Sequence, residues 1–338
     1  MTRRIDRGIV PDATVKRTFV RKYLTTLAVP PQADLAVGSA ARLSAFNDER
    51  NGIVVADIVS EPVARSRETV LVERDNGITW VTLNRPEKRN AMSPQLHLEM
   101  REVLAELEVD DATRVVVLTG AGDKSWCAGQ DLGEFFRGMD DASSNAKLEV
   151  SRASIEWRWY RLNKFAKPTI AMVNGYCFGG GFTQLIACDF AIAADDAVFG
   201  LSEINWGILP AGLVSRALAE VIPLRDALYY VMTGETFDGK KAEEMRLVTR
   251  SVPRAQLRET VVDLAKVLME KNPAALRACK EAYKLCKNME FPAAEDYLVA
   301  KFESLHRVDP ENGYRKGIER FIDEKRYRPG FENYRTAK

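Results

Sequence analysis

Three consecutive glycines interrupt an apolar run in the segment NGYCFGGGFTQL, Asn174 to Leu185. Glycine has no Cβ, so a ligand atom can approach its backbone N–H closely. The residues that follow, FTQLIACD, have the pattern of a buried helix, and the start of a helix offers unpaired N–H donors and a partial positive charge. We therefore expect an anion to bind here. The structural alternative is tight packing of this helix against a strand, which also selects glycine.

The expected anion is not a phosphate. A phosphate-binding P-loop needs Lys followed by Ser or Thr after its glycines, and no such pair follows this segment. The glycine spacing also differs from the G-x-G-x-x-G fingerprint of dinucleotide-binding folds. The negative charge must therefore come from another kind of group.

A second turn has a similar character. The segment CAGQDL, Cys127 to Leu132, follows a predicted strand and precedes a predicted helix, so it can present another exposed N–H group. Two N–H donors from separate turns can form an oxyanion hole, which stabilises charge that develops during a reaction. The structural alternative is a capped turn in which Asp131 lies at the start of the helix.

A third segment, FGLSEINWGILP, supplies a carboxylate. Glu203 lies between apolar residues and close to Trp206. A carboxylate in such surroundings is either a buried ion-pair partner or a general acid/base with a raised pKa. The chain has only two histidines, His97 and His306, both in predicted helices, where a surface or packing role is usual. We therefore expect a carboxylate to carry the acid–base chemistry, and Glu203 is a candidate for it; both alternatives for Glu203 stay open at this point.

The composition is that of an ordinary globular protein. The chain has 338 residues, of which 46% are hydrophobic and 29% charged, and its formal net charge is +1. This balance predicts neither a nucleic-acid nor a membrane partner, and no apolar run approaches the roughly 20 residues of a membrane-spanning helix. Five cysteines without a CxxC pair predict reduced thiols, a cytoplasmic location and no metal site.

The chain divides into regions of different character. The N-terminal region is rich in Arg and Lys, and it is predicted to be a flexible extension or, alternatively, a targeting peptide. TVLVER and ITWVTLN then alternate around DNG, which predicts a hairpin. From about Gly212 onward the pattern is mostly helical. The predicted division is an extension over residues 1–67, an α/β core over 68–265 and a C-terminal helical segment for oligomerisation or a lid over 266–338.

Several segments together resemble the crotonase superfamily, the enoyl-CoA hydratases and isomerases, over about Thr69 to Tyr334. They are LNRPEKRNAMS, VVVLTGAG, CAGQDL, KPTIAMVNGYCFGGGF, ACDFAIA and FGLSEINWGILP. The resemblance implies a crotonase-like spiral of strand–strand–helix units with a helical C-terminal segment. It also implies a homotrimer or hexamer and an acyl-CoA thioester substrate, with no separate cofactor because CoA arrives as part of the substrate.

The resemblance also implies roles for individual residues. The backbone N–H groups of Gln130 and Gly180 would hold a thioester enolate oxygen, and Glu203 matches the lone catalytic carboxylate. Fatty-acid hydratases usually carry a second catalytic Glu at the position of Thr183. This chain has a hydroxyl residue there instead, as the hydroxycinnamoyl-CoA hydratase-lyases do. Its segment ALYYVMTGETFDGKKAEEM also resembles those enzymes. The resemblance further places Lys88, Ala128, Leu132 and Ser202 along the CoA chain and Trp206 in the acyl pocket.

The implied reaction is hydration of feruloyl-, 4-coumaroyl- or caffeoyl-CoA followed by retro-aldol cleavage to an aromatic aldehyde, such as vanillin, and acetyl-CoA. Two departures bear on it. The lyases carry tyrosines that hold the phenolic oxygen where this chain has Phe135 and Val299, while Tyr297 is predicted to point to another helix face, and Ala211 replaces an expected glycine. The alternatives are an enoyl-CoA hydratase or isomerase without cleavage, and a non-catalytic assembly or RNA-binding member that uses the basic extension.

Overall fold

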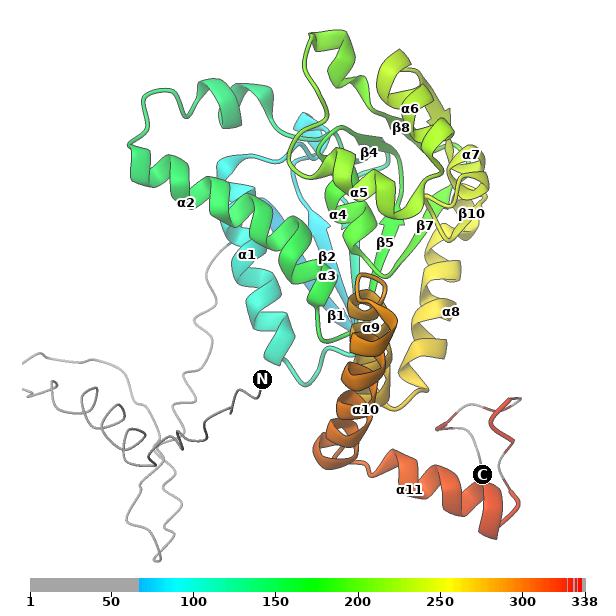
Figure 1. Ribbon diagram of the computed structural model, residues 1–338. Helices are drawn as coiled ribbons and strands as arrows, with labels where there is room; N and C mark the ends of the chain where they lie inside the picture. The colour runs from blue at the N-terminus through cyan, green and yellow to red at the C-terminus, as the bar shows by residue number, and fades with distance from the viewer. Residues whose placement is uncertain (1–66, 327, 331, 333, 336–338) are drawn as a thin grey trace, which may run out of the picture. The chain divides into compact units, whose positions relative to one another are not determined.

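Two β-sheets and surrounding helices make up the part of the chain that the computed structural model describes, residues 67–326, 328–330, 332, 334 and 335 (Figure 1). The larger sheet has the order β1-β2-β3-β5-β7-β10, and the smaller has the order β4-β6-β8-β9. Only β1/β2 and β8/β9 pair antiparallel within these sheets. The strands are β1 (Val70–Asp75), β2 (Ile78–Leu83), β3 (Val115–Gly120), β4 (Ser125–Cys127), β5 (Thr169–Val173), β6 (Tyr176–Phe178), β7 (Phe190–Ala194), β8 (Val198–Gly200), β9 (Thr236–Asp238) and β10 (Arg250–Val252).

The predicted hairpin is present at the start of the described chain. β1 and β2 pair antiparallel, with Asp75 opposite Ile78. The two loop residues, Asn76 and Gly77, have φ values of 50° and 86°. Positive φ at both loop positions is the geometry that favours Asn-Gly in two-residue hairpin turns, because it matches the twist of the strands.

A repeated strand pair organises the core. Each of β3, β5 and β7 in the larger sheet is followed within a few residues by β4, β6 or β8 in the smaller sheet. The three short strands are parallel neighbours, with Cys127 opposite Cys177 and Phe178 opposite Gly200. Because the carboxyl ends of parallel strands meet at one edge of a sheet, the three segments that follow them are brought together. These segments contain Gln130, Gly180 and Glu203.

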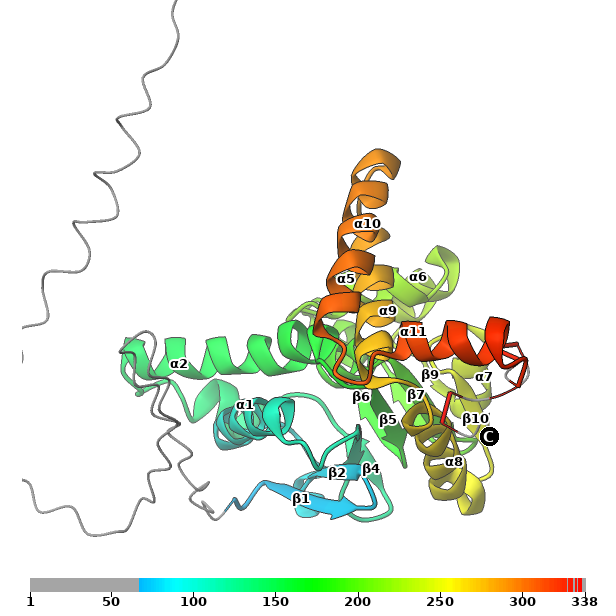
Figure 2. The same ribbon diagram turned by 90° about the horizontal axis from the view of Figure 1, so that it is seen from below.

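Helices cover the sheets and form the C-terminal part. Ser93 caps α1 as predicted, since its side chain accepts a hydrogen bond from the N–H of Leu96. Figures 1 and 2 show α9 and α10 packed side by side and extending away from the sheets. The helices are α1 (Pro94–Val109), α2 (Ser144–Ile155), α3 (Leu162–Lys164), α4 (Gly181–Ala187), α5 (Val214–Val221), α6 (Leu224–Thr233), α7 (Gly239–Glu244), α8 (Leu257–Met269), α9 (Pro273–Cys286), α10 (Phe291–Val308) and α11 (Gly313–Ile318).

Two strands lie in the region that was expected to be mostly helical. β9 extends the smaller sheet beside β8, and β10 extends the larger sheet beside β7. Each has three residues, which is too short to show the alternation by which a strand is recognised in a sequence. Their positions depend on pairing partners that are distant in the chain.

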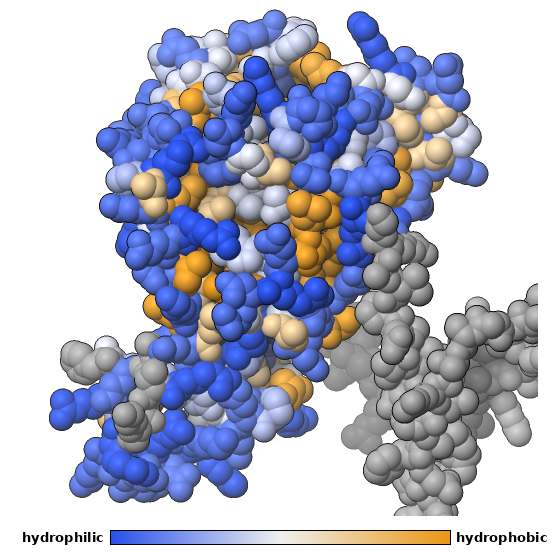
Figure 3. Space-filling view, turned by 180° about the vertical axis from the view of Figure 1, so that it is seen from behind, coloured by the Kyte–Doolittle hydropathy of each residue, from blue (hydrophilic) through white to orange (hydrophobic). Residues whose placement is uncertain are grey.

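The N-terminal region and the predicted boundary near residue 265 are features that the structure does not test. The predicted basic extension, apart from Arg67, lies outside the described residues, and the division near residue 265 stays a prediction. Within the described residues, no helix has the length and apolar character needed to cross a membrane. Figure 3 shows apolar side chains in orange exposed among polar ones on one face of the molecule.

Candidate active site

Two backbone turns face each other at the edge of the smaller sheet. Gly129 follows β4 with a φ of 92°, and a Cβ placed on it would lie 3.3 Å from the Gly180 nitrogen. The neighbouring backbone groups are paired, because Met92 N–H donates to the Gly129 carbonyl and Asp131 N–H to the Met92 carbonyl. Among the described residues, no acceptor pairs with the N–H groups of Gln130 and Gly180. The two turns thus present two free donors.

The three glycines meet different steric demands. Gly179 has a φ of 47°, and a Cβ on it would lie 2.9 Å from Oε1 of Glu203, so only glycine lets the carboxylate lie against this turn. Gly180 precedes α4 and provides one of the free N–H groups. A Cβ on Gly181 would lie 3.0 Å from the Cys127 carbonyl oxygen. The alternative of tight packing therefore explains Gly181 but not the free donor at Gly180.

Glu203 lies in the short helix η5 (Ser202–Trp206), which follows β8. Its side chain is half-buried, and burial raises the pKa of its carboxyl group. Its Oε2 atom is buried and has no hydrogen-bond partner among the described residues. The side chain therefore has the features of a general acid/base and lacks those of an ion-pair partner.

A cavity of about 720 Å³ joins the two turns to Glu203. The predicted site residues that line it are Ala128, Gln130, Leu132, Phe135, Gly180, Ser202, Glu203 and Trp206. A space of this size suits a small-molecule ligand. It is lined mainly by apolar groups, with a few polar atoms at the turns.

Four other predicted residues lie elsewhere. Thr183 is fully buried, and its hydroxyl donates to the Gly212 carbonyl at 3.0 Å. Lys88 is exposed on η2 (Pro86–Lys88). Tyr297 and Val299 lie on α10, where Val299 is 61% exposed. None of the four lines the cavity within the described chain, and their roles stay predictions.

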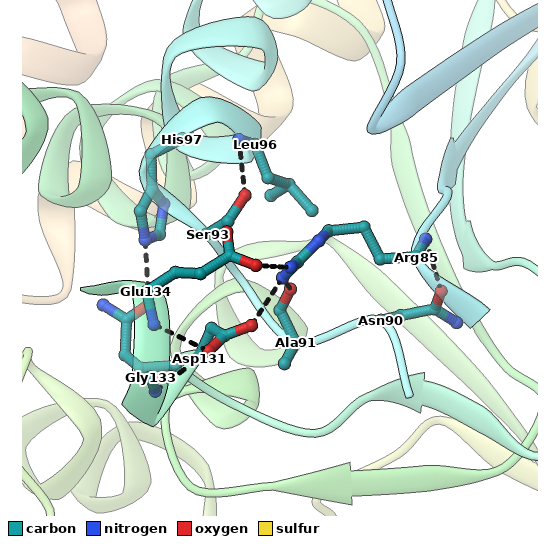
Figure 4. A network of polar contacts seen from close by, with 10 residues as sticks. Arg85, Asn90, Ala91, Ser93, Leu96, His97, Asp131, Gly133 and Glu134 are labelled. Carbon is teal, nitrogen blue, oxygen red and sulfur yellow. Dashed lines mark hydrogen bonds and ion pairs between the residues drawn. The ribbon is translucent and has the colours of Figure 1, made fainter. Parts of the chain in front are cut away.

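An ion-pair network holds the first turn in place (Figure 4). Asp131 caps η3 (Leu132–Arg137) by accepting hydrogen bonds from the N–H groups of Gly133 and Glu134. Arg85 donates to Asp131 at 2.9 Å and also pairs with Glu134. Burial acts to raise the pKa of Asp131, but these hydrogen bonds and the Arg85 charge outweigh it and lower the pKa. The capped turn that was the structural alternative for CAGQDL is therefore present, and it leaves the N–H of Gln130 free within the described residues.

His97 forms a buried chain of hydrogen bonds behind Gln130, which sequence reasoning missed. The Trp157 indole N–H donates to Nδ1 of His97 at 2.9 Å. Nε2 therefore carries the proton and donates to Oε1 of Gln130 at 2.8 Å. Burial, with a smaller contribution from the Arg158 charge, lowers the pKa of His97 to about 3. A neutral His97 thus orients the side chain of the residue that offers the first free N–H.

Three polar side chains on α2 and the adjoining helix η4 (Glu156–Arg161) also line the cavity. They are Ser151, Ser154 and Arg158, at positions i, i+3 and i+7. This spacing places side chains on one helix face, so a polar stripe could have been recognised in the sequence. The sequence could not show that this stripe faces a cavity, because a polar stripe is also typical of a solvent-exposed helix face.

Comparisons with known proteins identify the family of this chain. The family model for enoyl-CoA hydratase/isomerase matches residues 73–333. A hydroxycinnamoyl-CoA hydratase-lyase from Pseudomonas fluorescens is 53% identical over 268 residues, which cover 79% of this chain and 97% of that protein. A carnitinyl-CoA dehydratase from Escherichia coli strain K12 is 36% identical over 233 residues, covering 68% and 86% of the two chains.

A solved structure has the same fold. The crystal structure of an enoyl-CoA hydratase from Bacillus anthracis aligns with a TM-score of 0.67 and 26% identity, and it covers 75% of this chain and 96% of that one. The predicted crotonase-like architecture is therefore confirmed. The chain belongs to the enoyl-CoA hydratase/isomerase family.

Proposed function

We propose that this protein hydrates an aromatic trans-enoyl-CoA and then cleaves the product to an aromatic aldehyde and acetyl-CoA. The observation that carries the proposal is the convergence of two free N–H groups, from Gln130 and Gly180, with the unpaired carboxylate of Glu203 in one cavity. The 53% identical relative is named a hydroxycinnamoyl-CoA hydratase-lyase, which supports the same substrate class.

Hydration uses the two donors and the carboxylate together. Glu203 takes a proton from water as the water oxygen bonds to Cβ of the substrate. The electron pair of the double bond moves toward the thioester, and the resulting enolate oxygen is held by the N–H groups of Gln130 and Gly180. Glu203 then returns the proton to Cα, which gives a 3-hydroxyacyl-CoA. The raised pKa of Glu203 suits both proton transfers.

Cleavage repeats this cycle at a different bond. Glu203 removes the proton of the new β-hydroxyl, the Cα–Cβ bond breaks, and the aldehyde forms. The bond's electron pair becomes the enolate of acetyl-CoA, which occupies the same donor pair, and Glu203 protonates its carbon. Thr183 fits this single-carboxylate scheme, because its hydroxyl is engaged by the Gly212 carbonyl and offers no second acid/base.

The second candidate is hydration or isomerisation without cleavage. The observation in its favour is Phe135, which lines the cavity without a hydroxyl group to hold a substrate phenol. A thioester panel separates the two reactions. Purified protein is incubated with feruloyl-, 4-coumaroyl-, cinnamoyl- and crotonyl-CoA, and aldehyde, acetyl-CoA and 3-hydroxyacyl-CoA are quantified. Equal amounts of aldehyde and acetyl-CoA from the hydroxylated thioesters support the proposal, whereas hydroxyacyl-CoA alone supports the second candidate.

We also propose assembly as a homotrimer or hexamer. Large apolar side chains are exposed on several helices, among them Leu224 on α6, Tyr283 on α9 and Phe291 on α10. Exposed apolar groups mark a subunit contact where they form a contiguous patch. Sedimentation of the full chain tests this part, and a monomer at all concentrations would contradict it.

A further inference from the structure

Arg158 is a buried cation in the wall of the candidate active-site cavity. Its side chain is 3% exposed. Nε donates to the Ser154 carbonyl at 3.0 Å, and Nη1 donates to the Gly180 carbonyl at 3.3 Å. Within the described part of the chain, no carboxylate pairs with this guanidinium. The titratable groups that interact with its charge are the Cys127 thiol and the buried His97.

An arrangement of this kind needs a further partner. A guanidinium has five N–H donors, so these two hydrogen bonds leave three of them for other acceptors. Removal of a cation from water is costly unless the cation is paired or hydrogen-bonded. Burial lowers the pKa of Arg158 only to about 10, so the group remains charged at neutral pH. The cavity that it lines is the space from which a partner can come.

The backbone leaves room for the guanidinium beside the proposed donor turn. A Cβ on Gly212 would lie 3.2 Å from Nη2, and a Cβ on Gly180 would lie 3.3 Å from Nη1. The guanidinium therefore lies between the Gly180 turn and the loop that follows Pro210. It does not neutralise the proposed acid/base, because the pKa of Glu203 is raised by burial without a compensating ion pair.

We propose that Arg158 binds an oxygen atom on the aromatic ring of the acyl group, a phenol held as its phenolate. This inference rests on the proposed function and specifies its substrate class. Phe135 shares the same cavity and supplies no hydrogen bond to such an oxygen. A cation with free donors gives both the charge and the hydrogen bond that a phenolate requires, and charge-assisted hydrogen bonds are about twice as strong as neutral ones.

The competing role is electrostatic support of the enolate through the Gly180 peptide. That role would favour every thioester equally, whether or not its ring carries an oxygen. The two roles therefore differ in how the effect of replacing Arg158 depends on the substrate.

Binding of two saturated thioesters separates them without any turnover. The ligands are 3-(4-hydroxyphenyl)propanoyl-CoA and 3-phenylpropanoyl-CoA, which have no double bond to hydrate. Titration calorimetry gives the ratio of their dissociation constants for the wild type, Arg158→Met and the charge-conserving Arg158→Lys. We expect the wild type to favour the hydroxylated ligand by roughly 10- to 100-fold more than Arg158→Met does, with Arg158→Lys in between. Equal ratios in all three proteins would overturn the inference.

A second measurement needs only the wild-type protein. The ligand 3-(4-hydroxy-3-nitrophenyl)propanoyl-CoA carries a phenol that ionises near neutral pH and absorbs visible light as its phenolate. We expect the bound phenol to have a lower pKa than the free phenol, because Arg158 stabilises the anion. Half-ionisation of the bound ligand should occur at a proton concentration roughly tenfold higher or more. An unchanged or higher pKa would overturn the inference even if every variant fails to fold. Absent aldehyde formation with normal Arg158-dependent binding would instead refute only the proposed function.

Discussion

His97 should make the protein lose stability as the pH falls, in a way that replacing this one residue removes. The imidazole is fully buried, and its pKa is lowered from 6.5 to about 3. In the unfolded chain it binds a proton below pH 6.5, while in the folded chain it stays neutral until about pH 3. The unfolded state therefore binds more protons in this window, so stability falls as the pH falls through it.

The size of the effect follows from this difference. From about pH 7.5 to about pH 5, the His97 contribution reduces the free energy of unfolding by about 2 kcal/mol, at about 1.4 kcal/mol per pH unit once the unfolded histidine is mostly protonated. The variant His97→Gln lacks this contribution. It should be less stable at neutral pH, because the Trp157 indole and the Gln130 amide lose their shared partner, but its stability should vary less with pH.

Urea unfolding of both proteins at the two pH values measures the difference, at one protein concentration so that assembly does not change the comparison. His306→Gln is the matched control, since it removes the other histidine of the chain and keeps the contacts of His97. If the wild type and His97→Gln lose the same free energy between the two pH values, the buried neutral state of His97 is refuted.

Three further predictions concern catalysis. Glu203→Gln should lower kcat for hydration of 4-coumaroyl-CoA by roughly 10²- to 10⁴-fold, and near-full turnover by the variant would contradict this. The wild-type kcat/KM should fall toward acid with a pKa above 4.5, because burial raises the pKa of the carboxylate that we propose as the base. Gly180→Ala adds a methyl group 3.3 Å from both Nη1 of Arg158 and Cε of Met92, and the displaced donor should lower kcat by up to roughly 10³-fold. Binding of cinnamoyl-CoA, which has no ring oxygen for Arg158 to hold, should change little, and stopped-flow absorbance measures both quantities. An unchanged kcat would mean that this turn is not the donor. Phe135→Tyr should raise kcat/KM for 4-coumaroyl-CoA relative to cinnamoyl-CoA by roughly two- to tenfold, because the added hydroxyl can donate a hydrogen bond to the ring oxygen. An equal change for both substrates would place the ring elsewhere.

Short sequence patterns predicted the features that depend on interactions between residues close together in the chain. The Asn76–Gly77 turn could be predicted because positive φ favours those two residues. The start of α1 could be predicted because Ser93 is a strong cap. Glu203 could be named as a candidate because a carboxylate between apolar residues is an unusual pattern, and its catalytic role stays a prediction.

The rest of the site depends on contacts between distant parts of the chain. His97 is separated by 33 residues from Gln130 and by 60 from Trp157, so its buried hydrogen bonds leave no mark on the pattern of its own helix. Arg158 follows the spacing of an exposed stripe, and only the folded chain shows that the stripe faces a cavity. β9 and β10 likewise form by pairing with β8 and β7, which are distant from them in the sequence.

The most direct test of the central claim is the fate of 4-coumaroyl-CoA in D₂O. If Glu203 delivers a solvent-derived proton to Cα once in hydration and once after cleavage, wild-type protein should yield 4-hydroxybenzaldehyde and an equal amount of acetyl-CoA whose methyl group carries two deuterium atoms. Mass spectrometry of both products reads this directly. Formation of 3-hydroxyacyl-CoA with a single deuterium and no aldehyde would contradict the account, because the donors and the carboxylate would then support hydration alone.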